Sequence, residues 1–135
     1  MKWHQDLTIS VKERFDLPGY GPWSVKVGVP HVLPPLEVMR SIIAARIHLD
    51  PCSLDNGALN VLPGSHSKGK LEEAEIACLV EEGAAVGLAC EPGDVLFMSP
   101  LLLHSSRKSL NPEHRRVLHI EYSKMTLPGG LTWGG

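Results

Sequence analysis

The chain has 135 residues, which is enough for one hydrophobic core and too few for two. It carries 13 Lys and Arg against 15 Asp and Glu, so its formal charge is −2 with neutral histidines. This balance excludes the strongly basic surface that a nucleic acid or an anionic membrane selects, and no apolar run is long enough to span a bilayer. The three cysteines form no CxxC pair and the first segment has no apolar core, which is typical of a cytoplasmic protein.

Glycine and proline are frequent, with 13 and 11 residues, which favours short strands joined by turns over a helical bundle. Residues 3–11 alternate between polar and apolar side chains, as in a strand with one buried face. Residues 17–38 contain five prolines and are expected to form a long irregular loop that acts as a lid. Residues 41–49 and 58–64 are predicted to form an antiparallel pair of strands joined by a turn.

Farther along, residues 70–82 have the spacing of a short amphipathic helix, whose predicted apolar face consists of Leu71, Ala74, Ala77 and Cys78. The remaining predicted strands are residues 86–90, 95–98, 101–104 and 116–122. The glycine-rich tail is expected to be loosely held. This order of elements predicts a mainly β protein with a short helix, folded as a single domain over residues 1–135 in a sandwich or barrel.

His4 and Asp6 are the first candidates for a functional site. Residues i and i+2 of a strand point to the same face, so an imidazole nitrogen and a carboxylate oxygen could meet the same ion. A histidine from a distant strand would complete the triangle of two histidines and one carboxylate that non-haem Fe(II) oxygenases use, and His104 follows an apolar run. An HxD pair alone is a weak signal, because it occurs often by chance.

Arg115 lies eleven residues after His104 and strengthens this interpretation. If the two residues lie on neighbouring antiparallel strands, both can face the interior of a barrel. A guanidinium there would clamp a dicarboxylate such as 2-oxoglutarate in two hydrogen bonds. Ser106 shares a strand face with His104 and could add a further hydrogen bond, whereas alternation turns Arg116 outward.

Further residues are candidates for the pocket. Thr8 shares the face of the predicted metal ligands and could support them. Arg46 and His48 share one face of their predicted strand, which either lines the pocket or faces solvent. Trp23 either covers the pocket or anchors the long loop, and His119 is expected to be an ordinary buried histidine of the barrel core.

Four stretches of the sequence point to one known family: WHQD (3–6), DNGALNVLPGSHSKG (55–69), PGDVLFMSPLLLHSS (92–106) and RRVLHIEY (115–122). Together they resemble the phytanoyl-CoA dioxygenase family, whose members are Fe(II)- and 2-oxoglutarate-dependent oxygenases with a double-stranded β-helix, or jelly-roll, fold. The resemblance extends from Trp3 to Tyr122. It implies iron ligands at His4, Asp6 and His104, and contacts to 2-oxoglutarate at Arg115 and Ser106.

The resemblance implies an enzyme that hydroxylates a small-molecule substrate with O2 and releases succinate and CO2. Family members are longer and have helices and a barrel strand before the HxD strand, so this chain is expected to lack N-terminal elements of the jelly roll. Two alternatives stay open: a metal-binding, cupin-like domain without oxygenase activity, and an inactive truncated remnant of an oxygenase. A sheet edge left exposed would favour a homo-oligomer.

Overall fold

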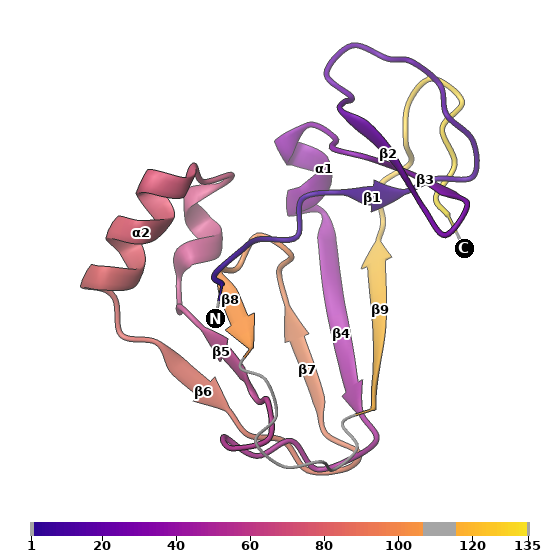
Figure 1. The fold of residues 1–135 in the computed structure, drawn as a ribbon. Helices are drawn as coiled ribbons and strands as arrows, with labels where there is room; N and C mark the ends of the chain where they lie inside the picture. The colour runs from indigo at the N-terminus through magenta and orange to yellow at the C-terminus, as the bar shows by residue number, and fades with distance from the viewer. Residues whose placement is uncertain (1, 107–115, 135) are drawn as a thin grey trace.

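The computed structural model describes residues 2–106 and 116–134, and the strands in these ranges form three antiparallel, three-stranded sheets (Figure 1). The first has the order β7-β4-β9 and consists of β4 (Ile42–His48), β7 (Val95–Met98) and β9 (Val117–Ser123). The second has the order β6-β5-β8 and consists of β5 (Leu59–Val61), β6 (Val86–Leu88) and β8 (His104–Ser106). The third has the order β1-β3-β2 and consists of β1 (Ile9–Ser10), β2 (Trp23–Lys26) and β3 (Val29–Val32).

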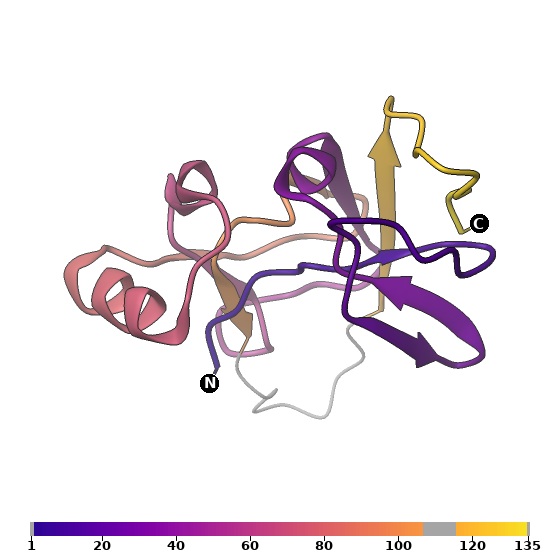
Figure 2. The same cartoon turned by 90° about the horizontal axis from the view of Figure 1, so that it is seen from above.

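The first two sheets share an apolar interior. Ala44 and Met98 of one sheet pack in a single cluster with Leu59 and Val61 of the other, and all four are buried. The N-terminal segment crosses one end of both sheets, from the start of β8 towards β1 (Figures 1 and 2). This crossing segment contains the HxD pair, so the candidate ligands lie where the two sheets meet the N-terminal part of the chain.

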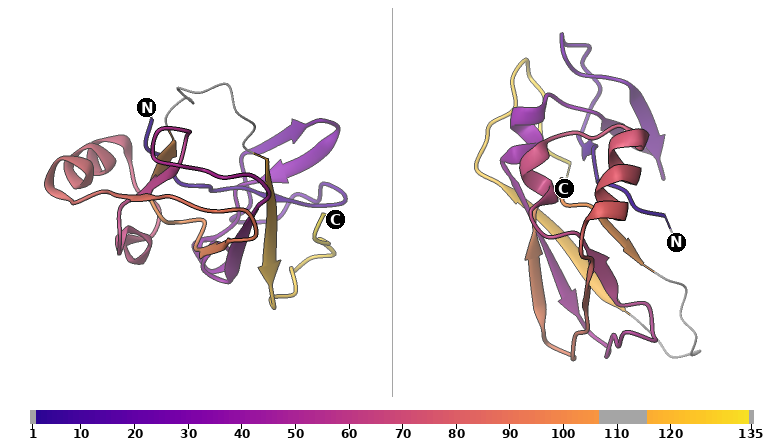
Figure 3. Two further views of the ribbon diagram at one scale, coloured as in Figure 1. Left: turned by 90° about the horizontal axis from the view of Figure 1, so that it is seen from below. Right: turned by 90° about the vertical axis from the view of Figure 1, so that its left-hand side faces the viewer.

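The helices α1 (Leu36–Arg40) and α2 (Glu73–Glu82) lie at the same end of the strands (Figure 3). Helix α2 falls within the segment predicted to be helical, but its apolar face differs from the predicted one. Ile76 and Leu79 contact the core, whereas Ala74, Ala77 and Cys78 are exposed and Leu71 is buried ahead of the helix. Neither helix of the described ranges has the length and apolarity needed to cross a membrane.

Residues 17–38 are not the irregular loop that their prolines predict. They contain the hairpin of β2 and β3, in which Trp23 lies opposite Val32, and the start of α1. The turn between the strands is made by Val27 and Gly28, both with positive φ angles of 51° and 75°, as two-residue hairpin turns require. This local turn signal is stronger than the breaking effect of the prolines, although the role of the segment as a lid stays a prediction.

The strands predicted at 41–49 and 58–64 exist as β4 and β5, but they do not pair with each other. Strand β4 lies between β7 and β9, and β5 lies between β6 and β8. The segment between β4 and β5 is held by reciprocal backbone hydrogen bonds of 2.8 and 2.9 Å between Cys52 and Cys90, which follows β6. This segment therefore crosses from the first sheet to the second, and pairing between distant strands replaces the predicted hairpin.

Three other predicted segments also differ from the structure. Only Ile9–Ser10 of the predicted strand 3–11 form a named strand, and β8 begins at His104 because the preceding leucines lie in a turn. The C-terminal tail is not loose, because Leu127 and Leu131 are only 6% and 5% exposed and belong to the same buried cluster as Ile9. Apolar residues between the glycines thus fix the tail.

Candidate metal centre

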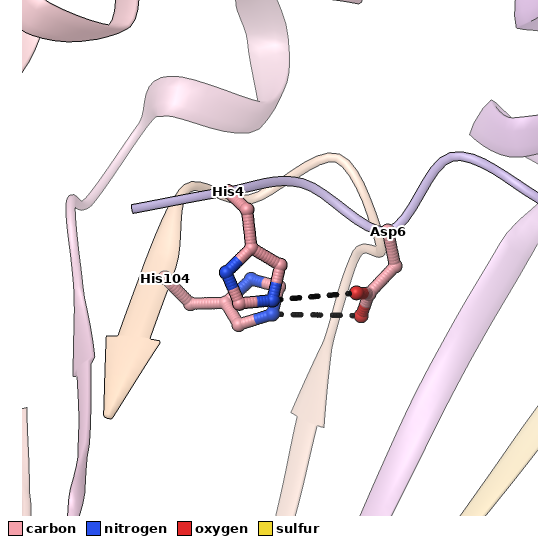
Figure 4. Close-up of side chains that lie close together, drawn as sticks. All are labelled: His4, Asp6 and His104. Carbon is pink, nitrogen blue, oxygen red and sulfur yellow. Dashed lines mark ion pairs between the residues drawn. The ribbon is translucent and has the colours of Figure 1, made fainter. Parts of the chain in front are cut away.

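His4 and His104 lie directly opposite each other on neighbouring backbone segments (Figure 4). The amide of His4 donates to the carbonyl of His104 at 3.0 Å, and the amide of His104 donates back at 3.1 Å. Side chains of such an antiparallel pair project to the same side, and the two ring centroids are 4.3 Å apart. Asp6 follows on the same side, held by its amide hydrogen bond of 2.9 Å to the carbonyl of Pro100.

The three side chains converge on one point. The Nε2 atom of His4 lies 3.8 Å from Oδ1 of Asp6, and Nε2 of His104 lies 3.5 Å from Oδ2. One ligand atom from each residue lies within 4.8 Å of the other two, which makes this a group that could hold a metal ion. Ligands about 2.1 Å from an octahedral ion and at right angles to each other would be about 3 Å apart, and the separations of 3.5 and 3.8 Å exceed this distance by less than about 1 Å.

Both histidine rings are oriented for metal binding through Nε2. The Nδ1 atom of His104 lies 2.8 Å from the carbonyl oxygen of Leu102, and Nδ1 of His4 lies 3.3 Å from that of Lys2. A carbonyl only accepts, so each Nδ1 carries a proton and each ring turns its Nε2 atom towards Asp6. Either a proton on Nε2 or a bound cation must therefore lie between each Nε2 atom and the carboxylate. This donor set fits a divalent metal ion, with the tautomers already fixed.

The electrostatic coupling within the site agrees with this geometry. Burial raises the pKa of Asp6, but the hydrogen bond with His104 and the charges of His104, His4 and His119 outweigh it, so the pKa lies below its usual value. Burial lowers the pKa of His104, but the hydrogen bond and charge of Asp6 and the hydrogen bond to Leu102 raise it overall. The carboxylate is therefore ionised at neutral pH, as a metal ligand must be.

Gln5 is a residue that sequence reasoning missed. It lies between the two candidate ligands, points the opposite way and is buried. Its side-chain amide donates to the carbonyls of Gly69 at 2.7 Å and Leu101 at 2.8 Å, and its oxygen accepts from the amide of Leu71 at 2.9 Å. The alternation of the strand was the available signal, because a polar residue on its buried face needs internal partners.

A cavity of about 880 Å³ lies beside the carboxylate of Asp6. Thr8 lines it, as do His119 and Glu121 of β9, whose side chains form an ion pair at 3.4 Å. His119 is therefore not the ordinary buried core histidine predicted from the sequence, since 37% of its side chain is exposed. The cavity therefore leaves space for a small molecule beside Asp6, one of the three candidate ligands.

The other predicted pocket residues have different positions. Arg46 and His48 lie on β4 and do not line this cavity. Trp23 packs against the core cluster that contains Ile9 of β1 and Val32 of β3. The guanidinium of Arg14 lies 5.3 Å from the centroid of the Trp23 ring. Ser106 ends β8 opposite Leu59 and is exposed. Arg115 falls outside the described residues. Arg116 is exposed and forms an ion pair with Asp50 through two side-chain hydrogen bonds, which agrees with its predicted outward position.

Comparison with known proteins identifies relatives of this chain. A family model described as phytanoyl-CoA dioxygenase (PhyH) matches residues 1–117. The chain is 27% identical over 118 residues to a methylphosphonate hydroxylase of Gimesia maris, covering 84% of this chain and 44% of that protein. It is 30% identical over 96 residues to the peroxisomal phytanoyl-CoA dioxygenase of Homo sapiens, covering 61% of this chain and 28% of that protein. The chain thus spans less than half the length of these relatives.

Solved structures share the fold. AviO1 from Streptomyces viridochromogenes Tue57 superposes with a TM-score of 0.58 at 25% identity, covering 93% of this chain and 47% of that one. EctD from S. alaskensis, solved with 2-oxoglutarate and 5-hydroxyectoine, superposes with a TM-score of 0.54 at 25% identity, covering 61% and 30% of the two chains. These similarities confirm the predicted fold class, a mainly β jelly roll.

Proposed function

The chain belongs to the phytanoyl-CoA dioxygenase family, and from this membership we propose that it acts as an Fe(II)- and 2-oxoglutarate-dependent dioxygenase that hydroxylates a small molecule. The convergence of His4, Asp6 and His104 carries the proposal, because two imidazole nitrogens and one carboxylate are the donor set of non-haem Fe(II) oxygenases. Their Nε2 and carboxylate atoms would hold the ion from one side, so that the co-substrate and O2 would bind from the other.

When bound, ferrous iron supplies the O2 activation that couples conversion of 2-oxoglutarate into succinate and CO2 to hydroxylation of the substrate. The residues of this chain fix the ligand geometry and shape the surroundings. The carbonyls of Lys2 and Leu102 hold the two rings in the required tautomer, and Gln5 anchors the segment that carries His4 and Asp6. We assign the substrate to the cavity of about 880 Å³ beside Asp6.

We assign the far carboxylate of 2-oxoglutarate to Arg115, with a hydrogen bond from the hydroxyl of Ser106. The family resemblance supports this assignment. So does the position of Ser106, which shares the strand face of His104 at the end of β8. A guanidinium recognises a carboxylate with two parallel hydrogen bonds, which positions the oxo acid end towards the metal.

The test is anaerobic addition of Fe(II) and 2-oxoglutarate to the folded chain. We expect the visible charge-transfer band of an iron-bound 2-oxo acid, and we expect Asp6→Ala to remove it. Asp16→Ala is the matched control, because Asp16 is exposed and pairs with Arg14. Folded protein that shows no band would overturn the proposal.

A metal-binding, cupin-like domain without oxygenase activity is the rival function. It would bind Fe(II) through the same three side chains but would have no need of 2-oxoglutarate. Succinate formation in air, dependent on Asp6 and on added 2-oxoglutarate, separates the two. Iron binding without 2-oxoglutarate binding would favour the rival.

A further inference from the structure

Arg46 and His48 lie on the face of β4 that is turned towards the β6-β5-β8 sheet, where His48 is buried and Arg46 is half-buried. Alternate residues of a strand share one face, so they lie on the same side of β4 as Ala44. Ala44 is 2% exposed and packs against Leu59 and Val61 of the opposing sheet. The inner face of β4 therefore carries a guanidinium and an imidazole next to the apolar contact of Ala44.

Three nitrogen atoms of these two side chains are buried without a hydrogen-bond partner. The Nε atom of Arg46 and both ring nitrogens of His48 are buried without a hydrogen bond, and His48 is only 3% exposed. Within residues 2–106 and 116–134, no ion pair includes Arg46, and the carboxylate of Glu121 on the neighbouring strand pairs with His119 instead. A buried donor without an acceptor is costly, and the half-buried side chain of Arg46 holds such a donor at Nε.

This interior region adjoins the candidate metal centre. Val61, which packs against Ala44, lies opposite His104 in the register of β5 and β8. Arg46 itself lies opposite His119, which lines the cavity beside Asp6.

The unpartnered groups select an anion. All the free atoms on Arg46 are donors, so a metal cation is excluded as their ligand. Burial and the charge of Arg46 outweigh the opposing charge of Asp94 and lower the pKa of His48, which leaves a neutral ring that can donate one N–H group. A carboxylate matches this set, because it accepts two parallel hydrogen bonds from a guanidinium and has lone pairs left for a third donor.

We propose that Arg46, with His48 as a second donor, binds a carboxylate inside the barrel next to the metal centre. This inference rests on the proposed function and adds a residue to it, since Arg46 would act in addition to Arg115. The carboxylate has two chemical sources, the far end of 2-oxoglutarate or an acidic group on the substrate. The two sources are separated by experiment.

The test measures binding by isothermal titration calorimetry in protein loaded with Zn(II), which occupies the metal site without reacting with O2. Arg46→Met keeps the aliphatic stem and removes the charge. We expect it to weaken 2-oxoglutarate binding about 10- to 100-fold if the carboxylate is that of the co-substrate. Arg40→Met is the matched control, because Arg40 is exposed at the end of α1, and it should leave the affinity unchanged.

A second titration adds acetate to the Zn(II)-loaded protein saturated with 2-oxoglutarate. Acetate binding that Arg46→Met abolishes, together with unchanged affinity for 2-oxoglutarate, assigns the carboxylate to the substrate. A third titration adds glutarate, which has no keto oxygen to chelate a metal, to metal-free protein. Glutarate binding that depends on Arg46 supports the inference even where Zn(II) does not bind and the proposed function fails.

Thermal unfolding of the ligand-free variants gives a readout that a structural role would not produce. Arg46→Met removes a half-buried charge that forms no ion pair within the described residues, so its Tm should equal or exceed that of the parent chain. Arg46→Lys, which keeps the charge but loses the guanidinium fork, should retain the Tm and weaken carboxylate binding several-fold. A clear fall in the Tm of Arg46→Met, or unchanged binding in all three titrations, would overturn the inference.

Discussion

His104 and Asp6 join two segments from opposite parts of the chain through the 3.5 Å contact between Nε2 and Oδ2. The other ring nitrogen of His104 is already hydrogen-bonded to the carbonyl of Leu102, so Nε2 is the atom available to a metal ion. A metal bound there would connect the N-terminal segment to β8. Binding to the folded state alone should therefore stabilise the fold.

His104→Ala should remove this stabilisation. We expect Zn(II) to raise the Tm of the parent chain and to leave that of the variant unchanged, because a second histidine and a carboxylate alone hold the ion weakly. Thermal scans with and without Zn(II) measure the effect. His66→Ala is the control, since His66 is exposed in the Ser65–Lys68 turn. A metal-dependent rise in Tm that persists in His104→Ala would contradict the assignment.

Gln5→Ala should destabilise the chain even without metal. The substitution removes three hydrogen bonds to the backbone and leaves the buried groups of Leu71, Gly69 and Leu101 without their partner. We expect a loss of about 2–3 kcal/mol in the free energy of unfolding, measured by urea denaturation. Gln5→Glu keeps the acceptor for Leu71 but loses both donated bonds, so its cost should also be large. A wild-type unfolding midpoint for Gln5→Ala would show that the anchor is dispensable.

Much of the local structure was predictable because it depends on local chemistry. The strand at 95–98 and the α-helix within 70–82 follow from periodicity and turn residues, and the structure has both. The burial of Ile9 and Val11 follows from the alternation around the HxD pair. The proximity of His4 and Asp6 was predictable for the same reason, since two residues at i and i+2 share a face in any extended segment.

The features that could not be predicted depend on contacts between distant segments. Nothing near β4 shows that it lies between β7 and β9 and not beside β5. The partners of Gln5 come from residues 69–71 and 101, which only the fold brings together. The inner position of Arg46 becomes clear only from its register with β9. From the sequence alone, its face of the strand could be turned either to solvent or to the interior.

The metal-free chain should lose stability as pH rises above 6.5. The pKa of His104 is raised above 6.5 by Asp6 despite burial, so its contribution is complete below pH 6.5 and is lost as pH rises through the folded-state pKa. The pKa of Asp6 lies below 3.8, so its contribution is present above pH 3.8 and is lost as pH falls through the lower folded-state value. We expect the highest Tm of metal-free protein between these limits.

Metal should reverse the alkaline part of this profile. Zn(II) competes with the proton on His104, so its affinity should increase with pH over the range in which the metal-free chain loses stability. Thermal scans of both forms across this range measure the effect. In Asp6→Asn, the decline in Tm above pH 6.5 should become shallower, because the ring loses its charged partner. A metal-free Tm that does not change across neutral pH would contradict the coupling.

Substitution of the two adjacent arginines should have unequal effects. Arg116 is exposed and bound to Asp50, so Arg116→Ala should leave the binding of 2-oxoglutarate unchanged. Arg115→Ala should weaken it about 10- to 100-fold, since the proposed contact joins a guanidinium to a carboxylate. Calorimetric titration of the Zn(II)-loaded variants compares them directly. Equal losses in both variants, or a loss in Arg116→Ala alone, would contradict the assignment of Arg115.

The outer face of the β7-β4-β9 sheet should make the isolated chain self-associate. Ile43 lies opposite Tyr122, and Ala45 lies between Phe97 and Ile120, so one apolar surface crosses all three strands. Ile43, Phe97 and Tyr122 are 54%, 66% and 56% exposed, and contiguous apolar surface of this kind favours association. Sedimentation velocity should detect dimers or larger species that increase with concentration. Phe97→Lys should reduce these species. Leu54→Lys, which changes an exposed leucine outside this sheet, should not. A parent chain that stays monomeric at every concentration would contradict the prediction.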